Sequence, residues 1–544
     1  MPPHPHPAAP GFASRQLPGV GAPPFWEPKD LEVELKPLFG CKIGEDDWGQ
    51  GKECDPDWDD NTAPEEPPPP IVHGGYCGSV PSEVETIGFD CDRHRCSLDS
   101  CNDATALCWP INSGQYSPKS RAIPLFSYSE WNNGRLENAD CSIIRVIAYH
   151  INTCGLGDQV HIAISAWWSD GWPILKAVEA ASARGAIVRI ITGVEDQDPW
   201  FHTATWIGDR LKATIGPQNV RHWSSKKAFP NISHNKFVLI NRGKFGQHMV
   251  LISGANWAPF DIARHCDLLT VNSWKIWSAF LTYWNALWSS QENGEPTWYP
   301  TEFEDPEAGL SAHFWPVLNI VGEPEVDGGA SLKNPFLRII RRYKAEAATK
   351  IRIIAASWHY SGSGEDPGLA SGPGKDLVDE LVKYREDGAD VRVIGNHHLD
   401  PRCHSSWACQ VQPGMSPDAG SCETTNGVWK ELEDNQIPWA KCPPHAKILM
   451  ISGIHKSDNK WHQAVYTGSM NFSYEWGVPI PDVKAGAMAD SFIGVHDDPV
   501  IFSQYEEWWK WLCQNSAIGA GGPSPVCGDE HPFSPSPKPL KAVL

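Results

Sequence analysis

The chain has 544 residues, of which 41% are hydrophobic and 10% aromatic, so it is long enough for several domains and too apolar to be disordered. No stretch approaches the roughly 18 consecutive apolar residues of a membrane-spanning helix. The formal net charge of −21 weighs against a protein that binds duplex nucleic acid, because an acidic surface repels the phosphates and binding to it releases no counterions.

The first 120 residues are predicted to form an extension. Residues 1–75 combine an acidic run with a polyproline stretch, which favours an extended leader, and residues 76–120 hold closely spaced cysteines. Paired C-x2-C knuckles are absent, so we expect disulfides there and not a metal site. Sixteen cysteines favour the extracellular space or an endomembrane lumen, although the N-terminus has neither the basic start nor the apolar core of a signal peptide.

From about residue 120 the chain repeats one pattern. The segments that begin at Asp158 and at Thr349 each predict a strand, a loop, an amphipathic helix and a second strand. Each helix ends at a Gly-Ala pair before a short β-branched run, as expected for a left-handed C-cap and a buried parallel strand. We therefore predict two α/β sandwich domains, each a mixed sheet flanked by helices, related by a pseudo-two-fold axis. The expected ranges are 121–293 and 330–516, with a connector over 294–329 and a tail over 517–544.

A histidine and a lysine two residues apart occur at the same place in both repeats. Each pair precedes an apolar run, FVLI in the first repeat and ILMI in the second, and a second strand then ends in an asparagine. Residues two apart on a strand point to the same face, so each pair projects an imidazole and an ammonium group together. The six residues are His234, Lys236 and Asn256 in the first repeat and His445, Lys447 and Asn471 in the second.

Two histidines, two lysines and two asparagines suit the cleavage of a phosphodiester. Lysine and asparagine donors stabilise the non-bridging oxygens of the phosphate. One neutral histidine can attack phosphorus, while a second, protonated histidine gives its proton to the leaving oxygen. Because two ammonium groups supply the positive charge, the pattern requires no metal and no other cofactor.

This pattern resembles the phospholipase D superfamily, whose signature is H-x-K-x4-D followed by G-S-x-N, present twice in a two-domain chain. The resemblance covers about residues 140–515 and implies two repeated phospholipase D-like domains and a covalent phosphohistidine intermediate. It also implies that the six residues above are catalytic. By analogy with relatives, His234 is the expected nucleophile and His445 the expected general acid.

The chain departs from the signature in two places. Asn241 and Ser452 stand where the signature has aspartate, a residue that in the family supports the fold more than the chemistry. The first G-S-x-N has its first two residues exchanged, as Ser253-Gly254, whereas the second is intact and contributes Ser469 as a supporting residue.

The resemblance further implies an acidic residue, about 11 positions after the motif asparagine, that hydrogen-bonds a catalytic histidine. Asp267 lies 11 positions after Asn256. In the second repeat Asp490 matches by strand context but lies 19 positions after Asn471, while Asp482 matches better by spacing. We take Asp267 and Asp490 as the predicted supporting carboxylates.

Together these features predict a metal-independent phosphodiesterase that hydrolyses or transfers phospholipid headgroups at a membrane surface. An exonuclease of an endolysosomal lumen, acting on single-stranded nucleic acid, is the alternative, since that branch of the family has a similar length and a degenerate signature aspartate. A binding protein that kept the fold is a third hypothesis. The net acidity favours the lipid substrate, and the retained histidine, lysine and asparagine pairs argue against the binding protein.

Overall fold

The structure is a computed structural model that describes most of residues 116–515. The gaps in the described range are 129, 133–134, 139, 141, 169–170, 194–202, 224–231, 244–245, 259–260, 262–263, 294–301, 316–334, 357, 359–372, 397–427, 443 and 473–487. The predicted leader and tail, and nearly all of the predicted Cys-rich module, therefore lie outside the described residues.

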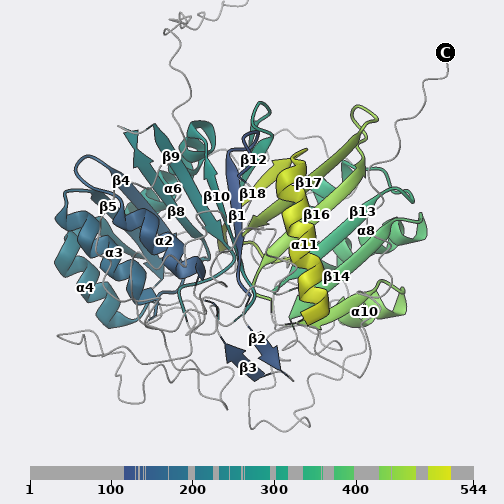
Figure 1. Ribbon diagram of the computed structural model, residues 1–544, viewed down its shortest axis with the longest axis horizontal. Coiled ribbons are helices and arrows are strands. Elements are labelled where there is room, and N and C mark those ends of the chain that lie inside the picture. Colours follow the sequence, from purple (N-terminus) through teal and green to yellow (C-terminus); the bar gives the residue numbers. More distant parts are fainter. Residues whose placement is uncertain are drawn as a thin grey trace, which may run out of the picture.

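Two mixed sheets lie side by side, and their strands follow the same order (Figure 1). Among the described residues the first sheet consists of β1 (Ala122–Phe126), β10 (Asp267–Asn272), β9 (Gln247–Ser253), β8 (Lys236–Arg242), β4 (Gln159–Ile164), β5 (Ile187–Gly193) and β6 (Val220–Trp223). The second consists of β11 (Glu302–Asp305), β12 (Leu310–Trp315), β18 (Met488–His496), β17 (Trp461–Gly468), β16 (Lys447–Ile454), β13 (Lys350–Ala355), β14 (Asp390–Asn396) and β15 (Trp439–Cys442). The short β7 (Ile232–Ser233) pairs in parallel with β18, and β2 (Glu130–Asn132) and β3 (Arg135–Asn138) form a separate hairpin. The prediction of two repeated α/β sandwiches is confirmed.

Helices cover both sheets. Those of the first repeat are α2 (Ser142–Asn152), α3 (Trp172–Ala183), α4 (Thr205–Ile215), the 3-10 turn η5 (Pro217–Asn219) and α6 (Trp274–Asn293). Those of the second are α7 (Pro335–Arg341), α8 (Pro373–Glu386), α10 (Val428–Asp434) and α11 (Pro499–Asn515). None of the helices in the described part of the chain combines the length and the apolar character needed to span a bilayer.

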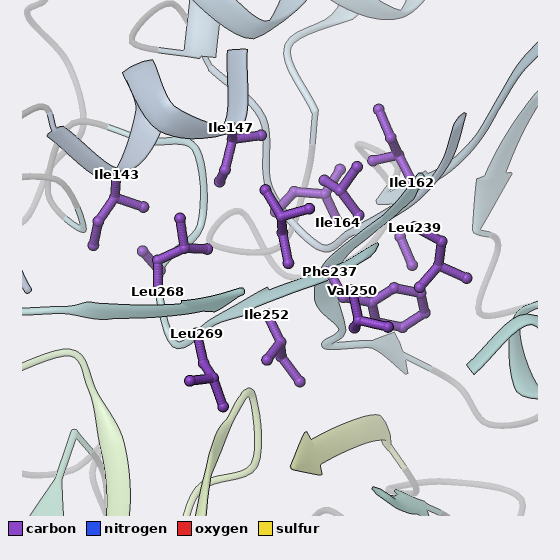
Figure 2. Packing of buried hydrophobic residues seen from close by; sticks show 14 of the residues in the cluster. Ile143, Ile147, Ile162, Ile164, Phe237, Leu239, Val250, Ile252, Leu268 and Leu269 are labelled. Atoms are coloured by element: carbon purple, nitrogen blue, oxygen red, sulfur yellow. The ribbon is translucent and has the colours of Figure 1, made fainter. Parts of the chain in front are cut away.

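The first sheet is apolar on both faces because each face meets a helix. In Figure 2, Ile143 and Ile147 of α2 point towards Leu268 on one face of the sheet. On the other face Phe237 packs edge-on against Phe280 of α6, with ring centroids 5.1 Å apart. Burial on two faces explains why β4, β8 and β9 read in the sequence as short continuous apolar runs.

The last helix of each repeat also packs on the other repeat. Helix α6 contacts β9 of its own sheet and β12 of the second sheet, while α11 contacts β17 of its own sheet and β1 of the first. Phe126 of β1 stacks on Trp508 of α11 at 4.9 Å and meets Tyr505 edge-on at the same distance. One hydrophobic core therefore runs through the junction, where β1 and α11 lie in Figure 1.

Two strands lie within the segment that was expected to be a connector. Strands β11 and β12 fall inside residues 294–329, and β12 pairs with β18 as β1 pairs with β10. All six residues of β12 are buried, although the sequence LSAHFW shows neither clear alternation nor a continuous apolar run. The strand forms because α6 and β18 bury it, which the local pattern does not reveal.

Candidate active site

The two H-x-K motifs meet at the junction of the repeats. The backbone N–H of His234 donates to the carbonyl of Ala489 in β18 at 2.8 Å, continuing the β7–β18 pairing. The backbone N–H of His445 donates to the carbonyl of His265, just before β10, also at 2.8 Å. Each motif histidine is thus anchored to a strand end of the other repeat.

The ring of His234 is held by a buried carboxylate. Its Nδ1 lies 2.8 Å from Oδ1 of Asp490, and the same oxygen accepts a 2.7 Å hydrogen bond from the hydroxyl of Ser469. Burial lowers the pKa of His234 to about 4; Lys236 adds to this shift and Asp490 opposes it. A neutral His234 that donates from Nδ1 carries its lone pair on Nε2. Asp490 therefore contacts a motif histidine, and it is the histidine of the opposite repeat.

The ring of His445 has a different environment. Its Nε2 lies 3.0 Å from Oδ1 of Asp261, a carboxylate that the sequence reasoning missed. Its Nδ1 lies 2.8 Å from the carbonyl oxygen of Gly254 and 3.0 Å from Nζ of Lys447. The other oxygen of Asp261 accepts the backbone N–H of Asn256 at 2.9 Å. Burial lowers the pKa of His445, and Asp261 opposes that shift.

Asp267 contacts neither motif histidine among the described contacts, which differs from the prediction. Its Oδ2 accepts hydrogen bonds from the hydroxyls of Thr467 at 2.6 Å and Tyr505 at 2.8 Å. Its Oδ1 is buried and has no hydrogen-bond partner among the described residues. The carboxylate of Asp267 therefore links the two repeats, and the carboxylate beside His445 is that of Asp261.

A shift of one residue between the repeats accounts for this difference. The carbonyl that binds the N–H of His234 belongs to the residue directly before Asp490. The carbonyl that binds the N–H of His445 belongs to His265, two residues before Asp267. Because side-chain directions alternate along an extended chain, such a shift turns the aspartate away from the ring.

The exchanged Ser253-Gly254 pair has a structural reason. Gly254 occupies the place that Ser469 has in the second repeat, two residues before the motif asparagine. A Cβ atom at Gly254 would lie only 2.8 Å from the carbonyl oxygen of His445, closer than real Cβ contacts allow. Glycine therefore lets the backbone of the second motif approach this loop.

Both motif lysines are buried and bind backbone oxygens. Nζ of Lys236 donates to the carbonyl of His234 at 2.8 Å, and Nζ of Lys447 donates to the carbonyls of His445 at 2.7 Å and Gly254 at 3.1 Å. Burial lowers the pKa of Lys447 to about 8, and burial together with the charge of Lys447 brings that of Lys236 well below its usual value. Two buried ammonium groups, of which Lys447 acts on the pKa of Lys236, favour a bound anion.

The two motif asparagines differ in their support. Oδ1 of Asn256 accepts a hydrogen bond from the hydroxyl of Ser165, which follows β4. Ala356 occupies the same position after β13, and Oδ1 of Asn471 is buried with no hydrogen-bond partner among the described residues. Ser165 was not predicted, and the only sequence signal for it is a small polar residue directly after an apolar strand.

The residues that replace the signature aspartate lie away from the site. Asn241 and Ser452 are five positions beyond the motif lysines on β8 and β16, or about 16 Å along an extended strand. They pair with Gln159 and Lys350, at the ends of β4 and β13 opposite the motifs. This placement agrees with a role in the fold. Among the described side chains, no group of three or more His, Cys, Asp or Glu residues is arranged to hold a metal ion.

Asp267→Asn is expected to make the stability of the protein less dependent on pH. Burial raises the pKa of Asp267 to about 6, so between about pH 4 and pH 6 the folded state holds a proton that the unfolded state has lost, and stability falls as the pH rises. The free energy of unfolding, measured with urea at about pH 4 and pH 7.5, should fall by about 3 kcal/mol more in wild type than in the variant. An equal fall in both proteins would contradict this reading of the carboxylate.

The chain was compared with known protein families and structures. Residues 147–288, in the first repeat, match the family model described as "Cardiolipin synthase, PLD-like domain". The first repeat therefore contains a phospholipase D-like domain, and the second repeat has the same strand order and the second H-x-K motif. No curated protein sequence is significantly similar to it.

Solved structures with a similar fold include three proteins of low sequence identity. Phosphatidylserine synthase from Haemophilus influenzae is 12% identical, with a TM-score of 0.44 over 74% of this chain and 93% of its own. Yeast tyrosyl-DNA phosphodiesterase is 10% identical, with a TM-score of 0.36 over 69% of this chain and 89% of its own. Polyphosphate kinase from Porphyromonas gingivalis is 13% identical, with a TM-score of 0.40, and the match spans 74% of this chain but only 52% of the kinase.

Proposed function

We propose that this chain is a phosphodiesterase of the phospholipase D type that acts on phospholipid headgroups through a phosphohistidine. One observation carries the proposal: two motifs far apart in the sequence share one buried site. Nδ1 of His445 and Nζ of Lys447 both contact the carbonyl of Gly254, in the loop that leads to Asn256. The carboxylate that holds His234 comes from the second repeat.

The hydrogen bonds support His234 as the nucleophile. With Nδ1–H directed at Asp490, the neutral ring has its lone pair on Nε2, and the lowered pKa keeps the ring neutral at ordinary pH. In the proposed first step this nitrogen forms a bond to phosphorus while the bond from phosphorus to the headgroup oxygen breaks.

His445 suits the role of general acid. Its ring nitrogens lie near the carbonyl of Gly254 and the carboxylate of Asp261, and the charge of Asp261 opposes the lowering of its pKa to about 3 by burial. In the proposal, the negative charge of the bound substrate supplies the remaining stabilisation of the protonated ring. Its proton would pass to the leaving oxygen. In the second step neutral His445 takes a proton from water or an alcohol, whose oxygen displaces His234 from phosphorus.

The charge of the chain favours lipid over nucleic acid as the substrate. A net charge of −21 gives a long polyanion no general attraction, whereas a single phosphodiester needs only the local charge of Lys236 and Lys447. The sixteen cysteines support our proposal that the protein acts outside the cell or in an endomembrane lumen.

The test is a side-by-side assay of the full-length protein on phosphatidylcholine vesicles and on a 5′-labelled single-stranded oligonucleotide. Release of choline without nucleotide is the expected result. Release of nucleotide alone would show that the substrate is nucleic acid and not phospholipid. If neither substrate is cleaved and both motif histidines are intact, the chain is a binding protein of this fold.

Activity is expected to survive removal of divalent metals. The ammonium groups of Lys236 and Lys447 supply the positive charge that a cation would otherwise bring to the phosphate. Choline release should be unchanged after dialysis against EDTA, with the fold checked by circular dichroism before and after. Loss of activity that zinc or calcium restores would contradict the proposed site.

A further inference from the structure

Protein groups engage both ring nitrogens of His445 in the structure. Nε2 lies 3.0 Å from Oδ1 of Asp261, while Nδ1 lies 2.8 Å from the carbonyl oxygen of Gly254 and 3.0 Å from Nζ of Lys447. The contact at Nε2 is an ion-pair distance without hydrogen-bond geometry, since Oδ1 of Asp261 has no hydrogen-bond partner among the described residues, but the carboxylate still takes up the space beside Nε2. A phosphate oxygen can therefore reach His445 only if one of these partners gives way.

The partner at Nδ1 cannot move easily. The Gly254 carbonyl belongs to a backbone segment packed so tightly on the second motif that a Cβ there would lie 2.8 Å from the carbonyl oxygen of His445. Lys447 also binds the carbonyl oxygens of both His445 and Gly254, at 2.7 and 3.1 Å, so it is held in place as well.

The partner at Nε2 can be released. Asp261 is bound at its other oxygen by the backbone N–H of Asn256 at 2.9 Å, so the side chain keeps an anchor when His445 leaves. The side chain of His445 is 12% exposed, whereas that of Asp261 is fully buried. The ring is therefore the group that can turn towards a ligand, and Nε2 is the atom that it would present.

In the first repeat the carboxylate lies at the other ring nitrogen. Asp490 binds His234 at Nδ1, the ring nitrogen opposite the lone pair that would attack phosphorus. A carboxylate on Nε2, as at His445, competes directly with an anionic ligand for the same N–H.

We propose that Asp261 is a positioning residue that restrains His445 by occupying, at Nε2, the place of a phosphate oxygen, so that a bound phosphate must displace it. This inference rests on the proposed phosphodiesterase function. The apparent association constant for phosphate is then the intrinsic constant multiplied by the fraction of molecules in which His445 has left Asp261. Asp261 thereby sets the affinity of the site for anions.

The experiment measures the binding of inorganic phosphate to the full-length protein by calorimetry. Asp261→Asn should bind phosphate roughly tenfold more tightly than wild type, because the neutral amide competes less well for Nε2. Asp267→Asn, which removes another buried carboxylate near Lys447, is the matched control and should change affinity by no more than about twofold. In a His445→Gln background the effect of Asp261→Asn should disappear. Unchanged or weaker binding by Asp261→Asn, or the same gain without His445, would overturn the proposal.

A second measurement distinguishes a failure of this inference from a failure of the proposed function. In ¹⁵N-histidine NMR of wild type, phosphate should shift the Nε2 signal of His445, assigned by its loss in His445→Gln, more than the Nδ1 signal. If phosphate binds but the Nε2 signal of His445 does not shift, the restraint by Asp261 is refuted, although the phosphate site itself stands. This measurement uses wild type, so it does not depend on whether Asp261→Asn folds. If no variant and not even wild type binds phosphate, the proposed function itself fails, and this inference fails with it.

Discussion

His234→Ala should lower kcat for phospholipid cleavage by roughly 10⁴-fold or more, because no nucleophile remains to form the covalent intermediate. The structure supports this role through the 2.8 Å contact between Nδ1 of His234 and Asp490, which leaves the lone pair on Nε2. Wild type quenched during turnover should carry acid-labile phosphate on His234, and the variant should carry none. Ethanol added during turnover should yield a transfer product in wild type, because the intermediate can be opened by any small alcohol.

His445→Ala is the matched control for this prediction. With a substrate whose leaving group is p-nitrophenol, departure needs little help from an acid, so the variant should still phosphorylate His234. It should then accumulate the intermediate, because no base activates the incoming water. Trapped phosphate on His445 and not on His234 would show that the two histidines have the opposite roles. Turnover by wild type with neither trapped phosphohistidine nor an alcohol product would rule out the covalent route.

Asp490→Asn should lower kcat/KM by roughly 10³- to 10⁴-fold, the loss expected when a buried carboxylate no longer fixes the tautomer of a catalytic histidine. An amide can turn its NH₂ towards Nδ1 and so place the proton of His234 on Nε2, where the lone pair is needed. The hydroxyl of Ser469, 2.7 Å from the same oxygen, offers no substitute because it does not contact the ring among the described contacts.

Asp267→Asn is again the matched control. Asp267 is the positional counterpart of Asp490, but it binds Thr467 and Tyr505 and not a motif histidine among the described contacts. Its replacement should change kcat/KM by less than about tenfold. Thermal unfolding of both variants separates loss of fold from loss of chemistry. Equal losses of kcat/KM in two folded variants would show that Asp490 acts only through the structure.

Much of this protein is determined locally by its sequence. The apolar runs after His234 and His445 form β8 and β16, and the Gly-Ala pairs at 185–186 and 388–389 follow α3 and α8 as predicted. These features depend on neighbours within a few residues, namely side-chain alternation, helix capping and turn chemistry. The repetition of the same pattern in two halves was enough to predict the paired sandwiches and the six motif residues.

Only the tertiary structure decides which carboxylate meets which histidine. The contact between His234 and Asp490 joins residues 256 positions apart, and Asp261 reaches His445 because the two repeats meet with a shift of one residue. Spacing along one repeat predicts a carboxylate near a histidine, but it carries no information about the register between repeats. A shift of a single residue reverses the direction of a side chain on an extended segment. The sequence alone therefore determined the two H-x-K motifs and the strands that follow them, and the packing of one repeat on the other made their surroundings unequal.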